Sequence, residues 1–183
     1  TVRVWDVRTR QTLHRLEGHT AGVATISVHP DSTVVASGSL DQTIRLWDMQ
    51  TGKVITVLHG HNAKVESVSF SPDGALLATA GHDRMVHIWD WREPRLLRTL
   101  IGHSNLVKTV CFRPQPHGNR GRLILASGGD DRTVILWDPL TGAQIGSLEG
   151  HAAAVLTAMF TADGAWLLTG SDDQTIRVWD MQA

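Results

Sequence analysis

Histidine, serine or threonine, and aspartate occur in this chain in an arrangement that could support nucleophilic catalysis. In that chemistry an imidazole takes the proton of a hydroxyl nucleophile, while a carboxylate orients the imidazole. His19, Ser37 and Asp41 form one such set, and three similar sets follow along the chain. A catalytic triad is needed only once in a domain. Four copies in succession therefore favour a structural role for these side chains over catalysis.

Two pairs of adjacent aspartates, at 130–131 and 172–173, could serve acid–base catalysis or bind a metal ion. In the other two sets the position before the aspartate holds Leu40 or His82, so only the second carboxylate of each pair is shared. We therefore predict that the first position is a surface position and that the shared aspartate has the structural role.

A further candidate is the pair His59 and His61, whose side chains are two residues apart. Zinc needs three or four converging ligands, and the only cysteine, Cys111, is distant in sequence. We predict no metal site, no cofactor and no enzymatic activity for this chain.

Two dipeptides mark a regular repeat. Trp-Asp occurs five times, separated by 42, 42, 48 and 42 residues, and Gly-His occurs four times in the same phase. A fixed period of this length is typical of an array of identical supersecondary units. The chain therefore consists of repeats in which each unit packs on its neighbours.

The period that ends at Asp90 shows what one unit contains. Val65–Phe70 alternates between apolar and polar residues, as a half-buried strand does, and 75–80 is almost entirely apolar, as a buried strand is. The turn between them is Ser-Pro-Asp-Gly, and 85–89 and 53–58 add a third and an outer strand. Four short antiparallel strands per period describe one blade of a β-propeller. We predict an all-β fold with about four blades.

The paired Gly-His and Trp-Asp markers resemble the WD40 repeat family over essentially the whole chain. In that family a tetrad of His, Ser or Thr, Asp and Trp holds each blade, and the resemblance places four tetrads in this sequence. The predicted tetrads are His19, Ser37, Asp41 and Trp47; His61, Thr79, Asp83 and Trp89; His103, Ser127, Asp131 and Trp137; and His151, Thr169, Asp173 and Trp179.

The repeat boundaries follow from the Trp-Asp markers. We expect a partial repeat at 1–6, full repeats at 7–48, 49–90, 91–138 and 139–180, and the start of another at 181–183. The long interval carries a basic insertion at 113–122, which we expect to be a mobile loop. WD40 propellers usually close with seven or more blades, so the chain is expected to be a fragment of a longer protein. Open strand edges then predict that the isolated fragment self-associates, with 12–16 completing the last blade in another copy or across the ring.

The resemblance also indicates where partners bind. In WD40 propellers the face with the outer-to-first and second-to-third turns is often the partner face, and residues that vary there between blades are expected to set specificity. Arg84 and Arg132 follow the turn aspartate in two adjacent blades and could bind a carboxylate or phosphopeptide, the alternative being two solvated arginines. The predicted partner-binding residues are Leu40, His82, Asp130, Asp172, Lys64, Glu66, Leu106, Lys108, Leu156, Arg84 and Arg132.

Composition limits the class of partner. The net charge is −1, with 17 basic and 18 acidic side chains, and Lys and Arg are scattered, which argues against nucleic acid or a membrane surface. A single cysteine fits a reducing compartment, so we expect an intracellular, cytoplasmic location, with the nucleus as the alternative. The predicted function is a non-catalytic scaffold or adaptor that binds other proteins or peptides. The alternatives are a sensor or regulatory WD40 segment of a larger enzyme (a kinase, protease or nucleotide-driven switch) and, through the basic insertion, RNA binding.

Overall fold

The computed structural model describes residues 1–115 and 121–182, and in these residues the chain forms seventeen β-strands arranged in five antiparallel sheets. We number the sheets I to V in chain order. Sheet I contains β1 (Val2–Asp6) and β2 (Gln11–Leu16). Sheet II contains β3 (Val23–Val28), β4 (Val34–Ser39), β5 (Ile44–Asp48) and β6 (Val54–Leu58).

The remaining three sheets follow the same order. Sheet III contains β7 (Val65–Phe70), β8 (Leu76–Gly81), β9 (Val86–Asp90) and β10 (Arg95–Leu100). Sheet IV contains β11 (Val107–Phe112), β12 (Leu125–Gly129), β13 (Val134–Trp137) and β14 (Gln144–Leu148). Sheet V contains β15 (Val155–Phe160), β16 (Trp166–Ser171) and β17 (Ile176–Asp180).

Turn chemistry explains why the first and second strands of a sheet form a hairpin. In sheet III the turn is Ser71 to Gly74, and the N–H of Gly74 donates to the carbonyl of Ser71 at 2.8 Å. Gly74 has a φ of 69°, a left-handed conformation that glycine adopts without steric cost. The Asp73 carboxylate accepts from the Ser71 hydroxyl and from the N–H of Ala75, so the turn satisfies its own polar groups.

The outer strand of each sheet belongs to the following sequence repeat. In sheet II, β5 pairs with β6, with Ile44 opposite Leu58, although β6 lies after the Trp-Asp that ends the repeat. The prediction that one period forms one blade is therefore wrong by one strand. Each complete sheet consists of the last three strands of one repeat and the first strand of the next, which ties neighbouring repeats together through a ladder of backbone hydrogen bonds.

Neighbouring sheets pack face to face through their apolar side chains. One buried cluster joins Ile44 and Leu46 of sheet II to Val65 and Leu77 of sheet III. Hydroxyl groups add a polar link at the inner strands, because backbone N–H groups of one first strand donate to Ser or Thr side chains of the preceding one. Val68, for example, donates to Thr25 Oγ1 at 3.4 Å. Each sheet therefore supports the next.

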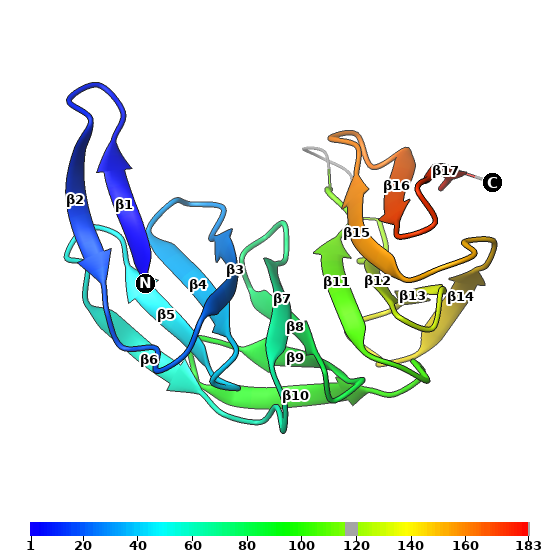
Figure 1. The fold of residues 1–183 in the computed structure, drawn as a ribbon, viewed down its shortest axis with the longest axis horizontal. Helices are drawn as coiled ribbons and strands as arrows, with labels where there is room; N and C mark the ends of the chain where they lie inside the picture. Colours follow the sequence, from blue (N-terminus) through cyan, green and yellow to red (C-terminus); the bar gives the residue numbers. More distant parts are fainter. Residues whose placement is uncertain (116–120, 183) are drawn as a thin grey trace.

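The five sheets form an open arc rather than a closed ring (Figure 1), with sheet I and sheet V at its two ends. The first strands β3, β7, β11 and β15 line the inside of the arc. The expectation that 12–16 completes the last blade is not met within the chain, because β2 pairs with β1 in sheet I. Sheet V is left with three strands.

The all-β architecture of four-stranded antiparallel blades is confirmed. Within residues 1–115 and 121–182 there is no helix with the length and apolar character that crossing a bilayer requires.

Candidate partner-binding site

Each predicted tetrad forms one continuous chain of hydrogen bonds inside a sheet. In sheet III, Trp89 Nε1 donates to Thr79 Oγ1 at 2.9 Å, and His61 Nε2 lies 2.8 Å from the same oxygen. His61 Nδ1 lies 2.7 Å from Asp83 Oδ2. Because an indole N–H can only donate, the hydroxyl proton goes to the imidazole, and the imidazole N–H goes to the carboxylate. Every member of the chain is satisfied.

The other three tetrads have nearly the same geometry. The imidazole lies 2.8 Å from both the hydroxyl and the aspartate, and the indole N–H donates to the hydroxyl at 2.8 to 3.0 Å. These contacts join His19, Ser37, Asp41 and Trp47; His103, Ser127, Asp131 and Trp137; and His151, Thr169, Asp173 and Trp179.

The tetrad aspartates are held in their ionised form. Burial would raise the pKa of Asp131, but the hydrogen bond and charge of His103 and the hydroxyl of Thr133 outweigh burial and lower this pKa to about 2. Burial likewise raises the pKa of Asp41, but hydrogen bonds from the Thr43 hydroxyl, the N–H of Thr20 and His19 outweigh it and lower this pKa. Asp173 also has a lowered pKa, first through Thr175 and then through His151. Each carboxylate therefore remains an acceptor at neutral pH.

This geometry leaves the tetrad hydroxyls without a route to a substrate. Ser37, Thr79, Ser127 and Thr169 are almost completely buried, and each already binds an indole and an imidazole. A nucleophile must reach a substrate carbonyl in order to attack it. The tetrads are accordingly structural links across each sheet, which orient the loops around them.

The loops beside the tetrads bring the predicted contact positions together in pairs. The N–H of the residue before each turn aspartate donates to the carbonyl just before the first strand of the same sheet, at 2.8 to 3.0 Å. The four pairs are Leu40 with Gly22, His82 with Lys64, Asp130 with Leu106, and Asp172 with Ala154. The two loops of each sheet thus lie side by side at the same end of the strands, and together they form one surface along the arc.

A β-bulge lies at the start of every first strand. In sheet III, Val65 pairs with Gly81 and Ser67 pairs with Ala80, so Glu66 is an extra residue in β7. The same register shift makes Ala24, Lys108 and Leu156 the extra residues of their sheets. A bulge bends the strand and re-aims the side chain of the extra residue. Four of the positions that vary between repeats are therefore at the one point in each sheet where the ladder is interrupted.

Four of the predicted contact residues form a charged cluster that spans two sheets. His82 Nε2 lies 2.5 Å from Glu66 Oε1, and Lys108 Nζ lies 3.3 Å from His82 Nε2. Lys108 Nζ is also 4.0 Å from Asp130 Oδ1. Glu66 and His82 belong to sheet III, whereas Lys108 and Asp130 belong to sheet IV. We call these four residues the inter-sheet charge cluster.

The cluster is partly shielded from solvent, with 22 to 26% of each side chain exposed. Apolar side chains lie on either side of it along the arc. Leu40 of sheet II is 38% exposed and Leu156 of sheet V is 44% exposed. The surface thus offers both charges and apolar contact area, which is the composition of a protein-binding patch.

The two predicted contact arginines extend from the same loops. Arg84 and Arg132 are exposed, and each has a φ of 69°, as the equivalent Gln42 and Gln174 do within a few degrees. Among the described residues neither arginine forms an ion pair, so both are solvated. A left-handed residue at this position belongs to the tight turn of every blade rather than to a ligand site of two blades.

Sequence reasoning missed the burial of His29 and His87 and the partners of Trp91. Trp91 is buried, and its Nε1 donates to the carbonyl of Gly74 at 2.9 Å. His29 of sheet II packs against Trp91 and lies 3.0 Å from the same carbonyl. His87 is buried beside His61 in sheet III. In the sequence, Trp91 lies in the loop after Asp90 and is interpreted as packing against that loop, with an exposed anchor for a partner as the alternative. The structure shows Trp91 buried, so the alternative is wrong. The neighbours of Trp91 come from another repeat, which sequence spacing alone does not reveal.

Trp166, in contrast, is more exposed than its position in the repeat predicts. Its equivalence with Leu76 predicts a packed side chain in the second strand, but Trp166 is 44% exposed at the end of the arc. Leu76 packs against the cluster between sheets III and IV, and the matching side of sheet V has no following sheet in the structure.

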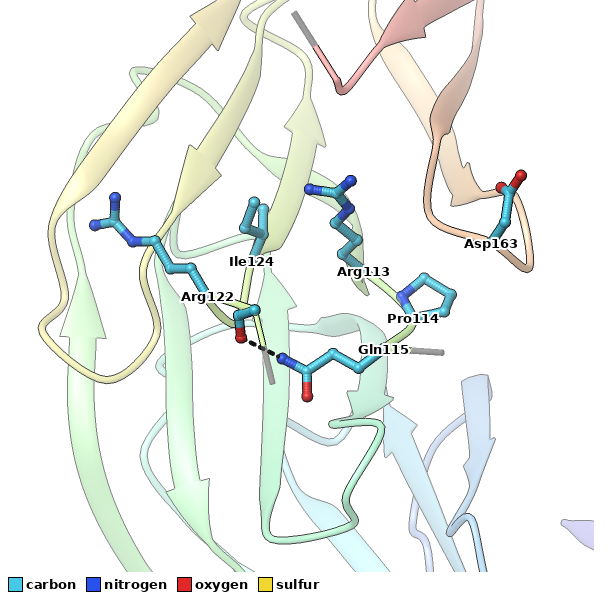
Figure 2. Close-up of a pocket in the computed structure, with 7 residues that line it drawn as sticks. Arg113, Pro114, Gln115, Arg122, Ile124 and Asp163 are labelled. Carbon is cyan, nitrogen blue, oxygen red and sulfur yellow. Dashed lines mark hydrogen bonds between the residues drawn. The ribbon is translucent and has the colours of Figure 1, made fainter. Parts of the chain in front are cut away.

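The basic insertion does not form a positive patch in its described part, and 116–120 lies outside the described residues. Arg113 Nε donates to the carbonyl of Gly164 at 2.8 Å, and Arg122 binds Asp138 at 2.9 Å. Figure 2 shows the two guanidinium groups directed toward different sides of the cleft that they line. This cleft lies at the opposite end of the sheets from the tetrad loops.

One group of side chains has the composition of a metal site. His61, Asp83 and His87 offer ligand atoms within 4.8 Å of one another. The tetrad already uses both ring nitrogens of His61 and Oδ2 of Asp83. A metal ion would have to displace these hydrogen bonds, so the arrangement fits the tetrad better than a metal.

Comparison with known families identifies the repeat. The model of the WD40 family, described as WD domain, G-beta repeat, matches residues 10–48, 52–90, 94–138 and 142–180. A search of curated proteins found no match. The four matched segments cover most of the chain and coincide with the tetrads and hairpins described above. The chain therefore belongs to the WD40 repeat family.

Proposed function

We propose that this chain is a non-catalytic adaptor that binds a protein or peptide on the surface formed by the tetrad loops. The observation that carries the proposal is the inter-sheet charge cluster of Glu66, His82, Lys108 and Asp130. WD40 repeats generally mediate protein–protein interaction. The cluster supplies what a specific partner needs, since it differs from blade to blade while the tetrads beneath it do not.

The charges of the cluster serve recognition better than stability. A partly shielded ion pair contributes little to stability, because solvent and side-chain entropy offset its Coulomb energy. Charged groups across a protein interface instead select the correct partner and exclude others by repulsion. Leu40 and Leu156 provide apolar area on either side. We infer a partner with both charges at its centre and apolar side chains toward its ends.

Two variants, each with the sign of one cluster charge reversed, test the proposal. Glu66→Lys and Lys108→Glu should each abolish capture of the partner in an affinity pull-down with mass spectrometry, because each places like charges together. A variant with Leu40, His82, Lys64 and Leu106 changed to Ala should lose the same proteins. The thermal melts should stay near that of the unaltered chain.

The matched control reverses exposed charges at the opposite end of the sheets, with Lys53→Glu and Glu93→Lys. These variants should retain every partner. If the cluster variants retain their partners while the controls lose them, recognition lies on the opposite end and the proposal is wrong.

The finer expectations about partners remain proposals. The even charge balance supports a protein partner over RNA, and the engagement of Arg113 and Arg122 by sheet residues supports the same choice. Strong weakening of a measured RNA interaction by modest salt would favour RNA. The intracellular location and the regulatory role within a larger enzyme stay predictions.

A further inference from the structure

The inter-sheet charge cluster contains one acid–base pair from each of two neighbouring sheets, in opposite order. In sheet III the bulge residue is the acid Glu66, and the residue before the turn aspartate is the base His82. In sheet IV the bulge residue is the base Lys108, and the residue before the turn aspartate is the acid Asp130. Two basic groups therefore lie between two carboxylates, and one of the bases is an imidazole, whose charge depends on pH.

The two short contacts of the His82 ring involve the same nitrogen. Nε2 lies 2.5 Å from Glu66 Oε1 and 3.3 Å from Lys108 Nζ. A carboxylate can only accept a hydrogen bond, and an ammonium can only donate one. Nε2 therefore binds Glu66 only when it carries a proton, and it binds Lys108 only when it does not. His82 cannot satisfy both neighbours at once.

Protonation of His82 favours its pairing with Glu66. Both ring nitrogens of an imidazolium carry a proton, so Nε2 donates a charge-assisted hydrogen bond to the carboxylate. The same positive charge repels the ammonium of Lys108, whose acidic neighbour in the cluster is Asp130 at 4.0 Å. Each carboxylate of the cluster is then neutralised by a base of the chain itself.

The neutral imidazole has no charge with which to balance Glu66. Where Nε2 accepts a hydrogen bond from Lys108, the Glu66 carboxylate has no donor within the cluster. The Glu66 side chain is 25% exposed, so a base from another molecule can reach it. Because the carboxylate is partly shielded from water, its attraction to such a base is stronger than at a fully exposed site.

The other charged groups around His82 do not compete for the imidazole. Asp83, the next residue, accepts from His61 in the tetrad. The carbonyl of Lys64 accepts the N–H of His82. The side chains of Lys64 and Arg84 are exposed, and neither forms an ion pair within the described residues. Among the acids of β7, β11 and the turns beside them, Glu66 is thus the one within hydrogen-bond distance of the His82 ring.

We propose that His82 is a proton-operated switch for partner binding. A lysine or arginine of the partner binds Glu66 while His82 is neutral, and the imidazolium displaces it when His82 gains a proton. This switch rests on the proposed function, to which it adds the chemistry of one contact and its regulation. Because the proton and the partner compete for one carboxylate, each weakens the binding of the other. Acidification through the range in which histidine ordinarily changes charge, about pH 8 to about pH 5, therefore releases the partner.

A double-mutant cycle tests the switch without a partner. Glu66→Ala and His82→Leu together install the pair found in sheet II, Ala24 and Leu40. Urea denaturation of the unaltered chain, both single variants and the double variant gives the coupling between the two positions. At about pH 5.5 the coupling should change the unfolding equilibrium constant about threefold, and at about pH 7.5 it should vanish. Equal coupling at both pH values would overturn the proposal, because Glu66 would then bind His82 whatever its charge.

A second measurement uses the protein recovered by the pull-down at about pH 7.5 as the probe. Its dissociation constant for the unaltered chain should rise at least about fivefold on acidification to about pH 5.5. With His82→Leu the ratio of the two constants should be close to one. The matched control is His14→Leu, which removes a histidine that contacts the carbonyl of Gln50 at the opposite end of the sheets. This control should keep the full pH dependence.

The switch and the proposed function fail in different measurements. If the charge variants of the cluster retain every partner, the proposed function is wrong, and the switch has no partner to release. If those variants lose the partner but His82→Leu retains the pH dependence of the unaltered chain, the proposed function stands and the switch is wrong. A partner that binds the unaltered chain equally at both pH values would likewise overturn the switch alone.

Discussion

At the residue scale, the tetrads show how a set of reactive side chains becomes a structural one. Imidazole, hydroxyl and carboxylate groups are the components of a hydrolase triad. Here, however, an indole N–H donates a hydrogen bond to the hydroxyl oxygen. The hydroxyl proton is committed to the imidazole, and the assembly is enclosed. The fourth residue, tryptophan, therefore separates the two interpretations, and the four copies of the set in the sequence already favoured the structural one.

Removing one tetrad carboxylate tests this account. Asp83→Ala leaves His61 and the N–H of Asn62 without their acceptor. We expect a loss of about 1–3 kcal/mol in the free energy of unfolding, the cost of leaving buried donors unpaired. Urea denaturation of the variant and of the unaltered chain measures the difference. An unchanged midpoint and slope would show that the tetrad contributes no stability.

His87 makes the stability of sheet III depend on pH through its lowered pKa. Burial lowers the pKa of His87 to about 4, with a smaller contribution from the nearby His61 charge, while Asp83 opposes the shift. The unfolded chain, in which a histidine has its ordinary pKa of about 6.5, binds this proton more readily. The stability that His87 contributes is thus complete above about pH 6.5 and is lost as the pH falls toward about 4.

The matching prediction concerns His87→Ile, which installs the residue found at the equivalent Ile135 of sheet IV. Between about pH 7 and about pH 4.5, the unaltered chain should lose about 2 kcal/mol more than the variant. Urea titrations at both pH values give the two slopes. Parallel slopes would mean that His87 is not the group that titrates.

At the element scale, the turns between first and second strands differ in how many side chains of neighbouring sheets pack against them. Ser32 and Gly74 occupy equivalent positions with φ of 62° and 69°. The carbonyl of Gly74 accepts from His29, Trp91 and Arg92, and so joins sheets II and III. A Cβ at Gly74 would lie 2.1 Å from His29 Nε2. The same left-handed backbone conformation is therefore exposed to solvent at Ser32, whereas at Gly74 it is packed against His29.

These two turns predict opposite effects of exchanging serine and glycine. Ser32→Gly should raise the free energy of unfolding by about 0.5–1 kcal/mol, since it relieves a left-handed non-glycine residue. Gly74→Ser should lower it by at least about 2 kcal/mol, because strain adds to displacement of His29. Thermal melts of both variants provide the comparison. Equal effects at the two sites would show that the link between sheets does not depend on this turn.

The elements themselves were largely predictable, because alternation, turn residues and the two dipeptides all have the same period. The assignment of the outer strand was not. Nothing in the local sequence of a strand such as Val54–Leu58 shows whether it pairs within the repeat before it or the repeat after it. Only the backbone pairing places it beside β5. The bulges at Glu66 and Lys108 were equally hidden, because an extra residue in one strand leaves no mark in composition.

At the scale of the whole molecule, stability should decrease from the middle of the arc toward its ends. Sheet III has a sheet on each side, and Leu77 and Ile88 within it are completely buried. Sheet I has only two strands, and sheet V is covered on one side. Local opening costs less free energy where fewer apolar contacts are lost.

Hydrogen exchange tests this gradient at a concentration low enough to keep the chain monomeric. Amide protons of β8 and β9 should exchange most slowly, and those of β1 and β17 should exchange at least tenfold faster. Uniform protection across all five sheets would instead indicate a single cooperative unit.

By itself, the sequence determined the repeat and the all-β blades, because both depend on spacing within one period, and its resemblance to the WD40 family indicated the residues of the four tetrads. The tertiary structure decided which repeats share a sheet, how Trp91 becomes buried against His29, and how Glu66, His82, Lys108 and Asp130 meet across two sheets. The contacts of Trp91 with His29 and of Lys108 with His82 join residues of different repeats. Their geometry depends on how one sheet packs on the next, and no local pattern encodes that distance.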